Sequence, residues 1–152
     1  MSTAGSIAWR RCHAPVDLAR IEEVEAKLGY VFPKDFRAFI GDHHGGKPDR
    51  EQFWYDDPVH GRYGSCLGAL LSFDLGYEGN IVDSRTWVEE ERLAARVIPF
   101  ARDGGGDAMC FDFRDDPENP TVVYWCHDKE PEIAIVPLAP TFTAFLEMLT
   151  ES

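Results

Sequence analysis

The sequence predicts an α+β domain, because helical periodicity occurs at both ends of the chain and strand-like alternation fills most of its last third. Two amphipathic segments occupy residues 17–45, apolar runs separated by turn-forming residues occupy 97–138, and an amphipathic segment follows Thr141. We therefore expect a largely antiparallel sheet with two helices before it and one after it. A chain of 152 residues suits one domain, which can fold without a disulfide or a metal.

The two N-terminal helices are predicted from caps and spacing. Asp17 can cap the first helix, and Gly29 can end it. Pro33 suits the first turn of the second helix, which Gly45-Gly46 can terminate. The apolar residues expected to face the core are Leu18, Ile21, Val24, Leu28, Phe36, Phe39 and Ile40. Residues 1–14 are expected to form a loose leader, from which Trp9 could pack on the body, and residues 15–152 to form the single domain.

The middle of the chain gives weaker signals. Residues 47–65 are polar and rich in turn formers, although they carry several aromatic residues. Residues 66–73 are apolar and fit either a strand or a helix. Residues 80–96 are predicted to be helical, with Asn80 as a cap.

Strands are predicted over 97–102, 108–113, 121–127 and 133–138. In the second of these, alternation places Met109, Phe111 and Phe113 on one face and Ala108, Cys110 and Asp112 on the other. Thr141 is expected to cap the final helix. The apolar residues of that helix follow helical spacing: Phe142, Phe145, Leu146 and Leu149.

The charge of the chain narrows the choice of partner. Asp and Glu number 27 against 15 Lys and Arg, which gives a net charge of −12. Such a surface repels phosphate backbones and anionic membranes, so we expect no nucleic-acid partner and no membrane partner. It attracts a basic protein, although acidity also serves solubility alone.

Location is predicted from features that the sequence lacks. No residue run has the length of a signal peptide core or a membrane span. The four cysteines are scattered without a C-x-x-C pair: Cys12, Cys66, Cys110 and Cys126. We expect a cytoplasmic protein with reduced thiols.

The stretch ARDGGGDAMCFDF, residues 101–113, invites a ligand-binding interpretation. The phosphate-binding pattern G-x-x-x-x-G-K-[ST], the dinucleotide pattern and the calcium loop are all absent, and Asp103 and Asp107 would repel phosphate. Glycines flanked by aspartate between two strands are typical of a hairpin connection. We therefore predict that Gly104–Gly106 connect antiparallel strands 97–102 and 108–113.

No catalytic, cofactor-binding or metal-binding residues are predicted. No serine lies in a G-x-S-x-G elbow, and the thiols of Cys110 and Cys126 fall within apolar strands, where they would be inert. His43 and His44 are adjacent and the sequence lacks H-E-x-x-H, so surface or capping roles are expected for these histidines.

The segment QFWYDDP, residues 52–58, places aromatic residues next to acidic residues. It fits an anchor for a basic partner, and equally an edge strand on which Phe53 and Tyr55 face the core and Trp54 covers it. The residues predicted to bind a partner are Trp54, Tyr55, Asp56, Asp57, Asp103 and Asp107.

Two stretches resemble the SUKH superfamily. LGYVFPKDFRAFIGDHHGGKP (28–48) is similar to its N-terminal signature, in which a helix ends in Leu-Gly and a second helix carries Phe-x-x-Phe and closes in Gly-Gly. VIPFARDGGGDAMCFDF (97–113) with the later VVYWCHD and TFTAFLEML resembles the C-terminal half. The family often has Asn before Gly-Gly, where this chain has His44.

The resemblance implies a bent, mainly antiparallel sheet flanked by helices, and a role without enzymatic activity. Bacterial members are commonly immunity proteins that neutralise toxins, many of them nucleases, and a fungal member regulates cell-wall assembly. We therefore expect an immunity protein for a basic toxin. The alternatives are an intracellular adaptor of the regulator type and an enzyme whose site no motif reveals.

Overall fold

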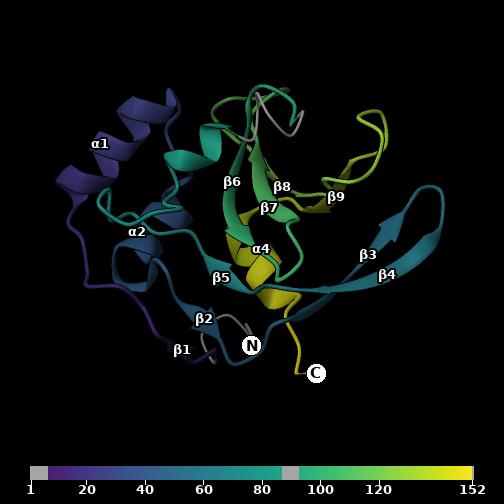
Figure 1. The fold of residues 1–152 in the computed structure, drawn as a ribbon, viewed down its shortest axis with the longest axis horizontal. Helices are drawn as coiled ribbons and strands as arrows, with labels where there is room; N and C mark the ends of the chain where they lie inside the picture. The colour runs from purple at the N-terminus through teal and green to yellow at the C-terminus, as the bar shows by residue number, and fades with distance from the viewer. Residues whose placement is uncertain (1–6, 87–92, 152) are drawn as a thin grey trace.

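The computed structural model describes residues 7–86 and 93–151, and within them the chain forms three α-helices and nine strands (Figure 1). Two helices come first, the strands follow, and one helix closes the chain. The neighbouring strands of every sheet are antiparallel. The predicted α+β class and helix order are therefore confirmed.

The two N-terminal helices begin and end close to the predicted residues. In α1 (Leu18–Leu28) the Asp17 side chain accepts a hydrogen bond from the Arg20 N–H, and Gly29 adopts a left-handed φ of 86°. Pro33 is the N-terminal cap of α2 (Lys34–His43), and Gly45 turns the chain away with a φ of 77°. Glycine suits these two positions because it has no Cβ to oppose a positive φ.

The five-stranded sheet follows chain order, with each strand beside its sequence neighbours. Its strands are β5 (Ala69–Leu70), β6 (Val97–Arg102), β7 (Ala108–Asp112), β8 (Thr121–Trp125) and β9 (Ile135–Ala139). The register shifts between Pro99 and Ala101 and again between Val122 and Val123. Such irregularities bend a strand and increase its twist.

The sheet is buried on both faces. Met109 and Phe111 pack in the main core with α2 and α4 (Phe142–Glu147), where the Phe36 ring lies 5.0 Å from both Phe111 and Phe142. Ala108 and Cys110 point the other way, into a smaller cluster. The alternation predicted for this strand is therefore confirmed, as is the Thr141 cap, which accepts from the Ala144 N–H.

A separate two-stranded sheet, β3 (Gln52–Asp57) and β4 (Gly61–Cys66), extends away from the body (Figure 1). We call residues 52–66 the arm. Its base is held by a bridge between Gln52 and Thr150, and Phe53 packs 5.4 Å from the Phe145 ring. An edge strand over 52–58 was one predicted alternative, whereas the polar, glycine-containing sequence of β4 gave no strand signal.

Residues 1–14 were expected to form a loose leader. Residues 1–6 lie outside the described part, and residues 7–14 are packed against the body. β1 (Trp9–Arg10) pairs with β2 (Lys47–Pro48), and the Trp9 ring lies 5.2 Å from Phe39. This strand pairing and ring contact hold the segment against α2.

Of the helix predicted over 80–96, the described residues show one α-helical residue, Thr86, and no helical structure over 93–96. A 3₁₀ turn occupies Asp83–Arg85, and residues 93–96 lead into β6 without helical structure. Residues 87–92 lie outside the described part. No helix among the described residues is long and apolar enough to cross a membrane.

Candidate partner-binding surface

The arm has one face toward the body and one toward solvent, because successive side chains of a strand point in opposite directions. Phe53 and Asp57 are buried, whereas Trp54 and Asp56 are exposed. Tyr55 lies between these extremes, with its ring 4.7 Å from that of Tyr124 on β8. The strand alternative is thus confirmed for Phe53, which joins the core. Trp54 and Asp56 face outward, and their binding to a partner stays a prediction.

Large apolar side chains are concentrated on the exposed parts of the arm. Trp54 and Tyr63 are each 45% exposed, and Val59 at the turn is 58% exposed. The Arg62 guanidinium lies 5.7 Å from the centre of the Trp54 ring, a cation–π arrangement. Aromatic residues and arginine are enriched in protein interfaces.

Asp57 is turned into the molecule, unlike its neighbour Asp56, although both were predicted to face a partner. Only 4% of Asp57 is exposed. Its carboxylate accepts hydrogen bonds from the N–H groups of Val59 and His60 and forms an ion pair with Lys129. Asp57 therefore fixes the turn of the arm and ties it to the β8–β9 loop.

The glycine stretch is the hairpin connection that the sequence predicts, joining β6 to β7. The Asp103 carboxylate accepts from the N–H groups of Gly105 and Asp107, at 2.8 and 3.0 Å. Gly106 has a φ of 99°, which an L-residue rarely adopts. Aspartate and glycine thus shape the turn itself.

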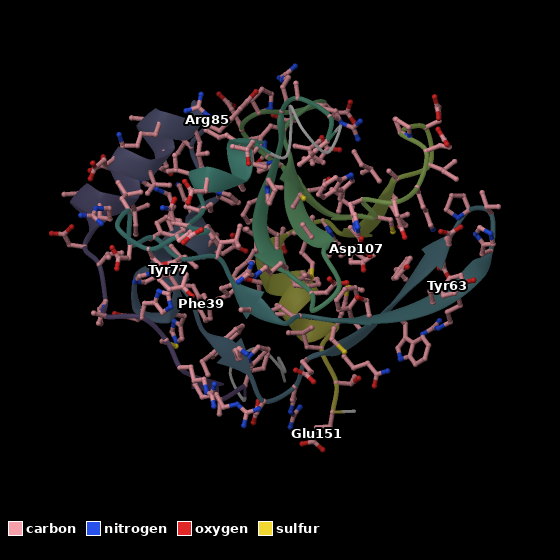
Figure 2. All side chains as sticks on the ribbon, in the orientation of Figure 1. Phe39, Tyr63, Tyr77, Arg85, Asp107 and Glu151 are labelled. Carbon is pink, nitrogen blue, oxygen red and sulfur yellow. The ribbon has the colours of Figure 1, made fainter. Side chains whose placement is uncertain are left out.

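Asp103 and Asp107 converge on one phenol. The Tyr124 hydroxyl lies 2.8 Å from Asp103, 2.9 Å from Asp107 and 3.0 Å from the Ser65 hydroxyl on the arm. Burial and the two carboxylates raise the pKa of Tyr124 well above its usual value. We call Asp103, Asp107 and Tyr124 the acidic junction, since it joins the glycine turn, the sheet and the arm; Figure 2 shows Asp107 between the sheet and the arm.

Asp107, His127 and Asp128 are the one group in the described part of the chain with metal-ligating atoms close together, within 4.8 Å. One Asp107 oxygen accepts from both the backbone N–H and Nδ1 of His127, and the other accepts from Tyr124. The carboxylate is thus already engaged by protein donors. Sequence spacing missed this group because Asp107 follows the glycine turn, whereas His127 is 20 residues further along the chain, beyond the end of β8.

The buried thiols lack the features of a nucleophile, as the sequence predicts. Burial raises the pKa of Cys126 to about 11, and it raises the pKa of Cys110 well above its usual value. The reactive form of cysteine is the thiolate, so these thiols are poorly reactive at neutral pH. All four cysteines are free.

His44 is fully buried, which corrects its predicted surface role, and it is the C-cap residue of α2, as the capping alternative expects. Its Nδ1 accepts the Phe73 N–H at 2.9 Å, and its Nε2 lies 2.8 Å from the Ala14 carbonyl oxygen. A neutral ring that carries its proton on Nε2 satisfies both contacts. His44 therefore connects the end of α2 to two distant segments.

The structure brings together only some of the six predicted site residues. Tyr55, Asp103 and Asp107 meet around Tyr124, whereas Trp54 and Asp56 lie on the other face of the arm and Asp57 is buried. Tyr63 and Val59 add exposed apolar surface that the sequence analysis did not select. Alternation along β4 could have suggested Tyr63, had the arm been recognised as a hairpin.

Comparison with known proteins identifies the family of this chain. The SMI1/KNR4 family (SUKH-1) matches residues 15–148, and the chain belongs to this family. A protein of Bacillus subtilis (strain 168), described as the SPbeta prophage-derived uncharacterized protein YokK, is 23% identical over 146 residues. The match covers 87% of this chain and 73% of that protein.

Proposed function

We propose that this chain is a non-enzymatic binding module, an immunity protein that binds and neutralises a basic toxin. The observation that carries the proposal is the arm, which presents Trp54 and Tyr63 to solvent on a chain with a net charge of −12. Exposed aromatic side chains supply binding energy when a partner buries them. Membership of the SMI1/KNR4 family supports a binding role.

Charge supports a basic partner, for which a nuclease is the leading class. The surface that a nuclease uses to hold phosphate is basic, so an acidic protein associates with it quickly and covers it. On the arm and the acidic junction, the acidic groups that such a partner would meet are the exposed Asp56 and the partly buried Asp103 and Asp107, which already accept hydrogen bonds within the chain. Asp57 has no part in this contact because it is buried.

The test is co-expression of this chain with the protein encoded directly upstream of it. If that protein is a toxin, growth of the host should be restored by this chain, and purified toxin should lose activity on mixing at equal concentration. The function as an immunity protein would be contradicted if growth is not restored although both proteins are made and folded. A general adaptor role would then be favoured.

A further inference from the structure

The arm has an open strand edge whose outward backbone groups can be assigned. Gln52 exchanges two backbone hydrogen bonds with Thr150, at 3.0 and 2.7 Å, so its N–H and C=O point away from β4. In an antiparallel pair this direction alternates from residue to residue. On β4 the backbone of Tyr63 therefore points toward β3, and the backbones of Arg62 and Gly64 point outward.

Nothing in the described part of the chain pairs with this outer edge. β3 and β4 form a sheet of two strands, and no described backbone group bonds to Arg62 or Gly64 on the outer side. Proteins commonly protect an edge with proline, lysine or a bulge. β4 contains neither of these residues, its register with β3 is continuous, and its charged residue, Arg62, lies over Trp54.

Side chains on both faces of the arm would contact a strand added at this edge. On one face the Trp54 ring covers Gly64, where an added Cβ would lie 3.0–3.2 Å from three ring carbons. On the other face lie Tyr63, 45% exposed, and Ser65, whose hydroxyl is 3.4 Å from the Asp103 carboxylate. An added strand therefore gains aromatic contacts and lies near negative charge.

We propose that the edge of β4 recognises its partner by strand addition, and that the added segment is an extended, basic stretch of the partner protein. Backbone hydrogen bonds to Arg62 and Gly64 give the pairing, while Trp54 and Asp103 select its side chains. A second copy of this chain is the less favoured occupant, because each copy carries a charge of −12. The inference rests on the proposed function and names how that same surface binds.

The first test compares Arg62→Pro with Arg62→Ala. Both variants lose the guanidinium, but only proline removes the outward N–H and crowds the edge, and it leaves the bonds to β3 intact. The probe is a displayed library of short randomised peptides, selected on the wild-type chain. Enriched peptides should be rich in Lys and Arg, and their affinity for Arg62→Pro should be about tenfold lower than for Arg62→Ala.

The second test measures amide exchange in the wild-type chain, so it does not depend on the folding of any variant. Binding of an enriched peptide should slow exchange at Arg62 and Gly64, whereas Tyr63 is already protected by β3. The inference is overturned by equal affinity for the two variants, by enrichment of acidic peptides, or by unchanged exchange at Arg62 and Gly64. A dimer of this chain that Arg62→Pro abolishes would also overturn it, because the edge would then bind a second copy.

Failure of strand addition is distinguishable from failure of the proposed function. If the wild-type chain neutralises the toxin and Arg62→Pro does so as well as Arg62→Ala, the immunity function stands and the edge is not its contact. If no toxin is neutralised but the peptides behave as expected, the edge is a binding site for another basic partner.

Discussion

The Tyr124 hydroxyl lies 2.8 Å from the Asp103 carboxylate, although 21 residues separate them in the chain. Asp107 approaches the same hydroxyl at 2.9 Å. The Tyr124 hydroxyl is therefore a donor that the two carboxylates share, and it reduces the repulsion between their like charges. The consequence is an acidic group, joined by hydrogen bonds, where the glycine turn meets the arm.

Replacing Tyr124 with Phe should lower the free energy of unfolding by about 1–3 kcal/mol, because partly buried carboxylates lose a donor. Chemical denaturation measures this change. Tyr63→Phe is the matched control, since that side chain is 45% exposed, and its effect should stay within about 0.5 kcal/mol. Equal stability of the two variants would show that the junction has no structural role.

Asp57→Asn should cost about 3 kcal/mol of stability, because it leaves Lys129 without its buried partner. Asp56→Asn, one residue away but exposed, should change stability by less than about 0.5 kcal/mol. Thermal melts of the two variants make the comparison. A similar loss in both would contradict the structural role assigned to Asp57.

Stability should fall as the pH drops below about 6.5, the usual pKa of histidine. Burial lowers the pKa of His44 in the folded chain, so the unfolded chain binds a proton more readily. The stabilisation is therefore complete above the unfolded pKa and is lost as pH falls toward the folded pKa. His44→Asn, which can keep an acceptor for the Phe73 N–H, should flatten this pH dependence. An unchanged slope in denaturation curves would exclude His44 as its source.

Trp54→Ala should weaken partner binding by more than about 2 kcal/mol, mainly through a faster dissociation rate, if the partner buries the ring. Stability should change far less than for a core aromatic residue, because 45% of Trp54 is exposed. Tyr77→Ala is the control, since Tyr77 is also 45% exposed but lies far from the arm (Figure 2). Binding kinetics run beside melts separate the two effects, and equal binding by both variants would contradict the anchor role.

Association with the partner should slow as salt rises, because exposed charges more than about 8 Å apart are largely screened at physiological ionic strength. Asp56→Lys should reduce the association rate more than it raises the dissociation rate, as expected for a charge at the rim of an interface. Stopped-flow mixing at several salt concentrations measures both rates. An association rate that responds neither to salt nor to this substitution would rule out electrostatic steering.

Patterns within a single segment predicted the fold well. The alternation of Met109 and Phe111 with Cys110, and the caps Asp17 and Thr141, depend on neighbours a few residues away, and the structure confirms them. Strand and cap chemistry is local, so one sequence is enough to detect it.

Those local patterns could not predict contacts between residues that are distant in the sequence. Asp57 and Asp56 are the same residue type in one strand, and burial of the first depends on Lys129, 72 residues away. The burial of His44 depends on Phe73 and Ala14 in the same way. The candidate site was therefore predicted as a set of residues, while its geometry had to come from the structure.

Alternate residues of β3 have different roles, because they lie on opposite faces of the arm. Substitutions at Phe53 or Asp57 alter contacts in the core or at the turn of the arm. Substitutions at Trp54 or Asp56 alter the surface that the arm exposes. Under the proposed binding role, substitutions at Trp54 and Asp56 would change the choice of partner while the core contacts of Phe53 stay in place.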